Sequence, residues 1–291
     1  MSHSARPQDS ATARPLSGVR IVCLANYVPA PAAARRLAAL GAEVLRVQPP
    51  TGDPLASWSP GWYDALRSGQ TIRRLDLKAA ADRAAFDSLL EDADLLLTAL
   101  RPAALARLGL DWPRLQARHP HLCSVAIVGH ASPDANRAGH DLTYLASHGL
   151  LRPPQMPATL LADLAGAERA ASAALALLLA RERGRGAGCA EVSLAESAGA
   201  FAEPLSHGIT APGGVLGGGF PGYALYEARD GWIALAALEP HFWSRLTGEL
   251  GLPTAAGREV LGGAFLERTA DAWERWAGER GLPIAAVRAP G

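Results

Sequence analysis

Residues 19–47, VRIVCLANYVPAPAAARRLAALGAEVLRV, carry the pattern that decides the fold. The short apolar run at 19–24 predicts a β-strand, and the run at 42–47 predicts a second one. An alanine-rich helix is expected between them over 32–40, ended by Gly41. A strand, a helix and a strand joined by short loops form a unit whose two strands lie parallel in one sheet.

The same alternation continues along the chain. Further strands are expected at 72–75, 95–97, 122–128 and 190–194, and helices at 79–90, after Pro102, and at 164–183. The mainly apolar run at 122–128 is typical of a strand in a parallel sheet that is covered on both faces. The sequence therefore predicts an α/β fold with a Rossmann-like, doubly wound large domain.

The C-terminal part of the chain predicts a smaller α+β unit. Its expected elements are two strands at 223–226 and 232–238 and two helices at 242–250 and 269–279. The stretch before them is rich in glycine and proline, which is typical of a linker or an active-site loop. The predicted organisation is a disordered tail over 1–17, a large domain over 18–205, a linker over 206–222 and a small domain over 223–291.

The composition of the chain limits the kinds of molecule that it is expected to bind. The 28 basic and 28 acidic side chains cancel, which argues against nucleic acid or a membrane surface as a partner. With 49% hydrophobic and 19% charged residues, the chain is expected to be globular. The sequence shows neither a secretory signal nor a run of apolar residues that could cross a bilayer, and the spacing of its 3 cysteines suits neither disulfides nor zinc. These features predict a cytoplasmic protein.

Three polar sites stand next to predicted helices or strand ends. Asp163 precedes the long helix, where free backbone N–H groups favour a carboxylate, but such a residue is more often a helix cap than a catalyst. His140 stands in a GHD segment before an apolar helical stretch, and alone it reads as a surface or cap residue. Glu239 ends an apolar strand, where it could serve a site or begin a helix with Pro240.

Taken together, the order of these motifs resembles one family. The matching pieces are PLSGVRIVCLA at 15–25, RRLAALGAEVLRVQPP at 35–50, LDLK at 75–78, LRPAALARLGLDWPRL at 100–115, AGHDLTYLASHGLL at 138–151, LADLAGAERAASAALALLLARERGRGAGCAEVSLAES at 161–197 and YALYEARDGWIALAALEPHFW at 223–243. The chain is similar in these pieces to the family III CoA-transferases and to the alpha-methylacyl-CoA racemases that share their fold. The most specific pieces are RP-x5-LGL, GHD and LEPHFW.

The resemblance implies roles for four residues. An aspartate at the position of Asp163 is the nucleophile in the transferases and an acid/base in the racemases. The racemases pair it with a histidine in a GHD segment, here His140, and with a glutamate near that histidine, here Glu239. Glu239 or Asp141 could orient the imidazole and stabilise its charged form. Because the transferases generally lack this histidine, the resemblance favours a racemase that inverts the alpha carbon of a 2-methylacyl-CoA.

The chemistry of racemisation suits these residue types. One base removes the alpha proton and a second returns it from the opposite face, and both need a pKa near the working pH. The enolate oxygen needs hydrogen-bond donors, which the helix after Asp163 is expected to offer, with Gly166 removing one side chain. Two alternatives stay open: a CoA-transferase with an aspartyl-CoA intermediate, and a non-catalytic subunit of a heteromeric CoA-transferase.

The resemblance also implies contacts with coenzyme A. Arg46 is expected near the adenine, Arg101 near the phosphates, and Arg73 and Arg74 beside the nucleotide, because arginine binds phosphate with two hydrogen bonds and stacks on adenine. Gly129 lies where the family has a Gly-aromatic-Gly turn of the CoA pocket, here altered to Val-Gly-His. Neither a metal nor a separate cofactor is expected, since coenzyme A enters as part of the acyl-CoA substrate.

The family assembles as an interlocked dimer in which the small domain of one chain closes the site of the other. The resemblance thus predicts a homodimer. Members of the family usually return to the large domain after a segment like 282–287, whereas this sequence ends at Gly291. The expected dimer is therefore an open ring.

Overall fold

The computed structural model describes residues 14–289, and the chain divides into two units, Met1–Phe201 and Ala202–Gly291. The division falls before the predicted end of the large domain at residue 205. Each unit contains its own cluster of buried hydrophobic side chains. Within residues 14–289, no helix is both long and apolar enough to cross a membrane.

The first unit is built on one parallel sheet. Its strands are β1 (Arg20–Leu24), β2 (Glu43–Gln48), β3 (Gln70–Arg74), β4 (Leu95–Thr98), β5 (Cys123–Val128) and β6 (Cys189–Ser193). The spatial order is β3-β2-β1-β4-β5-β6, and every neighbouring pair is parallel. This order is that of a doubly wound dinucleotide-binding sheet, so the predicted fold class is confirmed.

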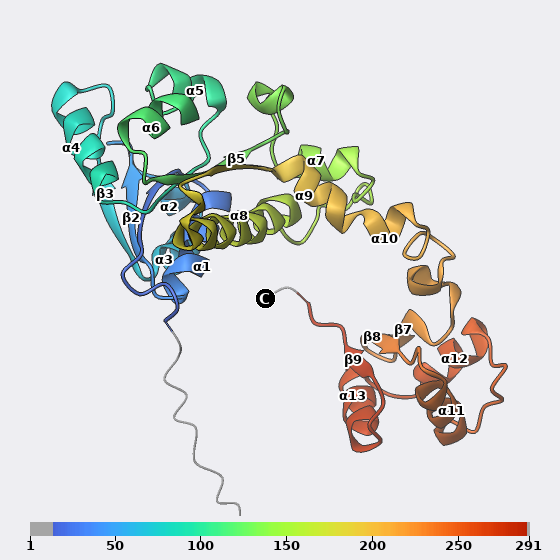
Figure 1. The fold of residues 1–291 in the computed structure, drawn as a ribbon. Coiled ribbons are helices and arrows are strands. Elements are labelled where there is room, and N and C mark those ends of the chain that lie inside the picture. The colour runs from blue at the N-terminus through green and yellow to red at the C-terminus, as the bar shows by residue number, and fades with distance from the viewer. Residues whose placement is uncertain (1–13, 290–291) are drawn as a thin grey trace, which may run out of the picture. The chain divides into compact units, whose positions relative to one another are not determined.

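Helices cover both faces of this sheet (Figure 1). One face carries α1 (Pro29–Ala39) and α8 (Leu161–Ala180), and the other carries α4 (Ala80–Glu91), α5 (Pro102–Arg107) and α6 (Trp112–Arg118). The alternation of side chains along β1 serves both faces: Ile21 and Cys23 join the first cluster, and Val22 and Leu24 join the second. A strand buried on both faces explains why its sequence is continuously apolar.

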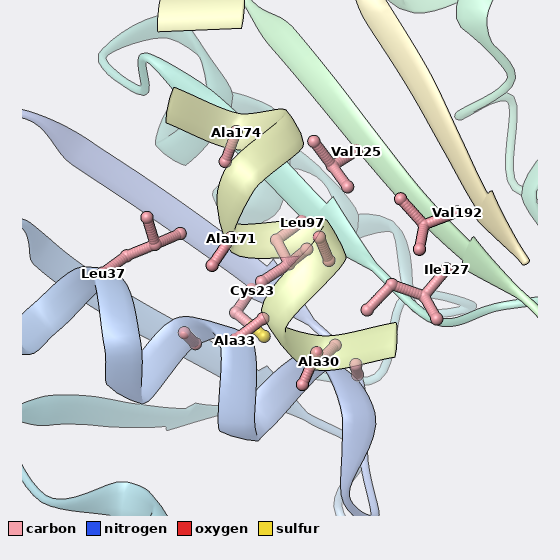
Figure 2. Packing of buried hydrophobic residues seen from close by; sticks show 14 of the residues in the cluster. Cys23, Ala30, Ala33, Leu37, Leu97, Val125, Ile127, Ala171, Ala174 and Val192 are labelled. Carbon is pink, nitrogen blue, oxygen red and sulfur yellow. The ribbon is translucent and has the colours of Figure 1, made fainter. Parts of the chain in front are cut away.

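Small side chains let α1 and α8 approach the sheet closely. Figure 2 shows Ala33 of α1 and Ala171 and Ala174 of α8 packed around Leu97 and Cys23 of the sheet. Burial raises the pKa of the Cys23 thiol to about 12, so this thiol stays protonated and acts as a packing residue. The alanine-rich composition of both helices is therefore a consequence of helix–sheet packing.

The sheet order reverses its direction between β1 and β4. Chains of this architecture bind ligands in the crevice outside the carboxyl ends of the strands at such a switch point. Here the segments that leave β1 and β4 are residues 25–28 and 99–101. Two short helices, α2 (Leu55–Trp58) and α3 (Pro60–Arg67), also belong to this unit and were not predicted. The helix α7 (Asp141–Ser147) matches the apolar helical stretch expected after His140. The helix α9 (Leu194–Phe201) ends the unit.

The second unit is a small α+β structure, as predicted. Its antiparallel sheet has the order β7-β8-β9, with β7 (Tyr223–Ala228), β8 (Gly231–Ala236) and β9 (Ile284–Ala286). Its helices are α10 (Glu203–Ser206), α11 (Pro240–Glu249), α12 (Arg258–Phe265) and α13 (Ala270–Glu279). The core contains Ile233 of the sheet and Leu246, Phe265 and Trp273 of the helices.

The predicted linker is in fact a folded part of the second unit. A Cβ atom on Gly217 would overlap the carbonyl group of Ala211, and Gly218 has a φ of 88° that favours glycine. Arg258 fixes the same loop, because its guanidinium donates to the carbonyl oxygens of Gly218 (3.2 Å) and Leu225 (3.0 Å). The glycines therefore allow close backbone packing, whereas the sequence pattern was taken as typical of a linker or an active-site loop.

The predicted disordered tail also needs correction at its C-terminal end. Leu16 is buried, and its backbone N–H donates to the carbonyl oxygen of Leu40 at 3.0 Å. The part of the tail at 14–17 is therefore packed against the first unit. Residues 1–13 lie outside the described part of the chain.

Candidate active site

Asp163 lies in the first turn of α8 without acting as its cap. The N-cap residue is Leu160, and within residues 14–289 no group donates a hydrogen bond to the Asp163 carboxylate. Burial, and secondly the nearby charge of Asp141, raise the pKa of Asp163 to about 7. At neutral pH this carboxyl group is therefore present in both protonation states, as an acid/base catalyst requires.

Asp141 connects α7 to the beginning of α8. It is 5% exposed, and its Oδ1 accepts the backbone N–H of Asp163 at 3.0 Å. Its Oδ2 is buried and has no hydrogen-bond partner in the described chain. No hydrogen bond joins Asp141 to the imidazole of His140 in that chain, so the structure gives Asp141 a different task from the predicted one: it caps α8 from outside that helix.

His140 precedes α7 as its N-cap residue, and its side chain is exposed. The Thr143 hydroxyl accepts the backbone N–H of His140 (3.0 Å) and donates to its carbonyl oxygen (2.8 Å). These bonds fix the backbone of His140 at the start of α7. Because Asp141 follows His140 directly and binds α8, the backbone of His140 is held beside the turn that carries Asp163.

Gly129 and Gly139 make room for one aromatic ring. A Cβ atom on either glycine would overlap the side chain of Tyr144, which is buried in α7. Gly129 directly follows β5 at the carboxyl edge of the sheet, so this packing fixes the GHD segment at that edge. The predicted place of Gly129 in the CoA pocket stays a prediction, and its contact in the protein is Tyr144.

Gly166 accommodates a neighbouring helix. A Cβ atom on Gly166 would overlap the side chain of Leu194, the first residue of α9. The absence of a side chain at this position therefore serves the packing of α8 on α9. The backbone N–H of Asp163 is also occupied, since it donates to Asp141. This N–H group is therefore not available to stabilise the enolate oxygen, a role that the sequence predicted for the first turn of α8.

Arg101 follows β4 and directly precedes α5, and its side chain is exposed. Its guanidinium forms no ion pair with the described residues. Its positive charge lowers the pKa of Tyr144, whereas the negative charge of Asp163 raises it, so all three groups lie within electrostatic range of one another. Arg101 is therefore positioned at the switch-point edge with a free cation, which fits a contact with a phosphate.

Arg73 and Arg74 end the edge strand β3, and both side chains are exposed. Arg74 lies beside Gly52, since a Cβ atom there would be 3.3 Å from an Arg74 Nη. The loop after β2 therefore meets the end of β3, and both arginines stay accessible for a nucleotide. Their role at coenzyme A remains a prediction.

Arg46 is placed differently from the prediction. Its side chain is 0% exposed, and its guanidinium pairs with the equally buried carboxylate of Asp53. Its Nε donates to the carbonyl oxygen of Ala25 at 3.4 Å. A guanidinium with no exposed surface cannot stack on an adenine in this structure. Arg46 is therefore a structural residue of the carboxyl edge.

Asp53 and Tyr27 were not singled out in the sequence, yet they shape the segment after β1. The Asp53 carboxylate accepts the backbone N–H of Tyr27 at 3.1 Å and that of Leu55 at 3.0 Å. Tyr27 has a φ of 67°, the one positive value among the non-glycine residues described. The buried carboxylate thus holds an uncommon backbone conformation at the switch point. The sequence signal for a residue such as Asp53 was Arg46, a charged residue inside the apolar run EVLRV that requires a buried partner.

Glu239 belongs to the second unit. It is the exposed N-cap residue of α11, with Pro240 in the first turn. This is the helix-start arrangement that the sequence also allowed. Its predicted partnership with His140 stays a prediction. In the described chain, no group of three or more His, Cys, Asp or Glu side chains is arranged to hold a metal ion.

The perturbed carboxyl group is expected to make the stability depend on pH. The folded pKa of Asp163, about 7, lies above its ordinary value of 3.8, so ionisation costs free energy in the folded state. This cost is absent below about pH 4, grows as the pH rises and is complete above about pH 7. The native chain should lose roughly 4 kcal/mol of stability relative to Asp163→Asn across this range. Urea unfolding of both chains at several pH values tests this, and a pH-independent difference would contradict it.

Comparisons with known proteins point to one family. The model of "CoA-transferase family III" matches residues 16–291. Alpha-methylacyl-CoA racemase from Homo sapiens is 31% identical over 257 residues, which cover 81% of this chain and 65% of that protein. Cinnamoyl-CoA:phenyllactate CoA-transferase from Clostridium sporogenes is 30% identical over 274 residues, covering 84% of this chain and 66% of that protein. The chain thus spans about two thirds of the length of these relatives.

A solved structure shows the same fold. The crystal structure of the hypothetical protein Rv3272 from Mycobacterium tuberculosis superposes with a TM-score of 0.82 at 26% sequence identity. The match covers 95% of this chain and 85% of that one. Because the family model spans nearly the whole sequence, the chain belongs to CoA-transferase family III.

Proposed function

We propose that the chain is an acyl-CoA racemase or epimerase that inverts the alpha carbon of a 2-methylacyl-CoA. The observation that carries this proposal is the state of Asp163: a half-buried carboxyl group with a pKa of about 7 and no hydrogen-bond donor in the described chain. Such a group can take and return a proton at neutral pH. His140, tethered beside it through Asp141, supplies a second base of the required type.

The reaction needs one proton transfer on each face of the alpha carbon. For one enantiomer, the ionised Asp163 takes the alpha proton, and the electrons of the broken C–H bond move to the thioester oxygen as an enolate. Protonated His140 then gives its proton to the opposite face of the same carbon. For the other enantiomer, the two residues exchange roles. Coenzyme A stays attached throughout and is bound as part of the substrate, with Arg101, Arg73 and Arg74 as the proposed phosphate ligands.

The transferase reaction is the second candidate, because some of the relatives are named as CoA-transferases. They are divided between racemases and CoA-transferases at about 30% identity. In that reaction the Asp163 carboxylate would attack the thioester carbonyl, form a mixed anhydride and expel the CoA thiolate. The thiolate would then attack the aspartyl carbonyl of the anhydride, release the donor acid as its carboxylate and leave an aspartyl-CoA thioester. His140 has no necessary part in these steps. Its presence in the GHD segment is therefore the feature that separates the two candidates.

Hydrogen exchange distinguishes the two reactions. A single enantiomer of a 2-methylacyl-CoA, incubated with the chain in D2O without an acceptor acid, is expected to gain alpha-deuterium and to lose optical purity. His140→Ala should slow inversion about 100- to 10,000-fold, the usual contribution of a general acid or base. Mass spectrometry and chiral analysis of the acyl group measure both effects.

His121→Ala is the matched control, because His121 is an exposed histidine in the turn before β5 and should leave the exchange rate unchanged. Transfer to an added acid without any alpha-deuteration would reject the racemase in favour of the transferase. Inactivity in both assays would favour the third possibility, a non-catalytic subunit.

We further propose that the working unit is a homodimer, since Glu239 lies in a different unit from His140 and Asp163. A glutamate from the partner chain would then stabilise the charged imidazole of His140. Sedimentation analysis over a range of concentrations tests this, and an active monomer would contradict it. A cytoplasmic location stays a prediction from the sequence.

A further inference from the structure

Tyr144 has a hydrogen-bonding group that the protein does not use. Its side chain is 2% exposed. Its backbone carbonyl oxygen accepts the Ser147 hydroxyl at 2.8 Å, whereas its own hydroxyl forms no hydrogen bond with any residue in 14–289. Although the ring is buried, the hydroxyl oxygen is not among the fully enclosed polar atoms that lack a partner, so a molecule from outside the protein can reach it. A bound ligand could therefore supply the hydrogen-bond partner that the protein does not.

The position of this hydroxyl is tightly fixed. It lies against Gly129 at the end of β5 and against Gly139 directly before His140, where a Cβ atom would be 2.8 Å from it. The imidazole of His130 packs edge-on against the phenol ring, with 5.3 Å between the ring centroids. A ring enclosed in this way cannot turn its hydroxyl aside, so the group is held at the carboxyl edge of the sheet before any substrate binds.

The surroundings also keep the phenol protonated. Burial, and secondly the negative charge of Asp163, raise the pKa of Tyr144 above its ordinary value, and the opposing effect of Arg101 is smaller. The hydroxyl is thus a donor over the whole neutral range. It also lies within electrostatic range of the carboxyl group that would take the alpha proton.

The reaction proposed above needs a donor of this kind. Negative charge develops on the thioester oxygen as the alpha proton leaves, and donors aimed at that oxygen stabilise the transition state. The backbone N–H of Asp163 cannot fill this role, because it already donates to Asp141. The Tyr144 hydroxyl is an unused hydrogen-bond donor of the kind that the thioester oxygen needs.

We propose that the Tyr144 hydroxyl donates a hydrogen bond to the carbonyl oxygen of the bound thioester and keeps it as the enolate forms. The expected effect on the reaction rate rests on the proposed function. The O–H bond of Tyr144 stays intact: the alpha proton goes to the base, and the electron pair goes to the oxygen that Tyr144 stabilises. Tyr144 would then be a catalytic residue alongside Asp163 and His140.

Tyr144→Phe tests the proposal with the smallest change of shape. The rate of alpha-deuteration at saturating substrate should fall about 100- to 1000-fold, the usual effect of removing one donor to such an oxygen. KM should change little, because the bond strengthens mainly in the transition state. The melting temperature should not fall, since the hydroxyl has no partner in the protein.

A second readout does not depend on which reaction the chain performs. An acyl-CoA labelled with carbon-13 at the thioester carbonyl should show a downfield shift of that signal when bound to the native chain. The shift should be lost with Tyr144→Phe. Tyr226→Phe is the matched control: it removes the hydroxyl of another buried tyrosine, one that donates to the carbonyl oxygen of Pro221 at 2.7 Å, and should leave the shift in place.

These measurements separate two kinds of failure. A native chain that shifts the carbonyl signal but exchanges no alpha proton would reject racemisation and keep the role of Tyr144 as a donor. Equal exchange rates and equal carbonyl signals in the native chain and Tyr144→Phe would overturn the inference. So would loss of folding in Tyr144→Phe, because it would show that the hydroxyl has a structural partner.

Discussion

Asp163→Ala is expected to lower turnover about 100- to 10,000-fold while the chain stays folded. The carboxylate accepts no hydrogen bond in the described chain, and its burial makes its ionised form unfavourable. Its removal should therefore leave the stability at pH 8 unchanged or raise it. Both candidate reactions need this residue, as a base in racemisation and as a nucleophile in CoA transfer. Alpha-deuteration and CoA transfer are measured together with the unfolding curve.

Glu168→Ala is the control for this experiment. Glu168 lies later on the same helix, and its exposed carboxylate pairs with the exposed side chain of Arg36 at 2.6 Å. The loss of such a surface pair costs at most about 1 kcal/mol. Activity should be retained. A folded Asp163→Ala chain with near-native activity in either assay would remove Asp163 from the site and both candidate mechanisms with it.

The fold of the first unit was predictable because β1, β4 and β5 are short, mainly apolar runs. The sequence predicted that the first helix begins at residue 32. In the structure α1 begins at Pro29, since proline fits the first turn of a helix. The helix α7 was expected only as an apolar helical stretch after His140, without bounds. It has 7 residues, and the bond from Asp141 to α8 supports it, which no local pattern reveals.

The site could be predicted in part. Asp163, His140 and Asp141 were found through motifs, but the contact between the two aspartates crosses 22 residues and depends on how α7 packs on α8. The prediction for Arg46 came from the resemblance, which placed this arginine near the adenine of coenzyme A. In the middle of an apolar strand, however, a charge requires a buried partner. That partner, Asp53, follows seven residues later, beyond a turn.

Asp53→Ala is expected to cost about 3–5 kcal/mol of stability, the usual result of removing one partner of a buried ion pair. The guanidinium of Arg46 would remain in the core without a counter-charge. The backbone N–H groups of Tyr27 and Leu55 would lose their acceptor, and the positive φ of Tyr27 would lose its support. Chemical denaturation measures the loss. Activity should fall as well, because the segment after β1 borders the switch point.

Two further variants show whether charge or hydrogen bonding dominates. Asp53→Asn keeps an acceptor for the backbone N–H groups and removes only the charge, so its loss of stability isolates the unpaired cation of Arg46. Asp64→Ala breaks the exposed pair with Arg67 and should cost less than about 1 kcal/mol. If Asp53→Ala cost no more than Asp64→Ala, the buried pair would not hold the segment after β1. If Asp53→Asn cost as much as Asp53→Ala, the charge of Arg46 would be the dominant requirement, and the hydrogen bonds to Tyr27 and Leu55 would contribute little.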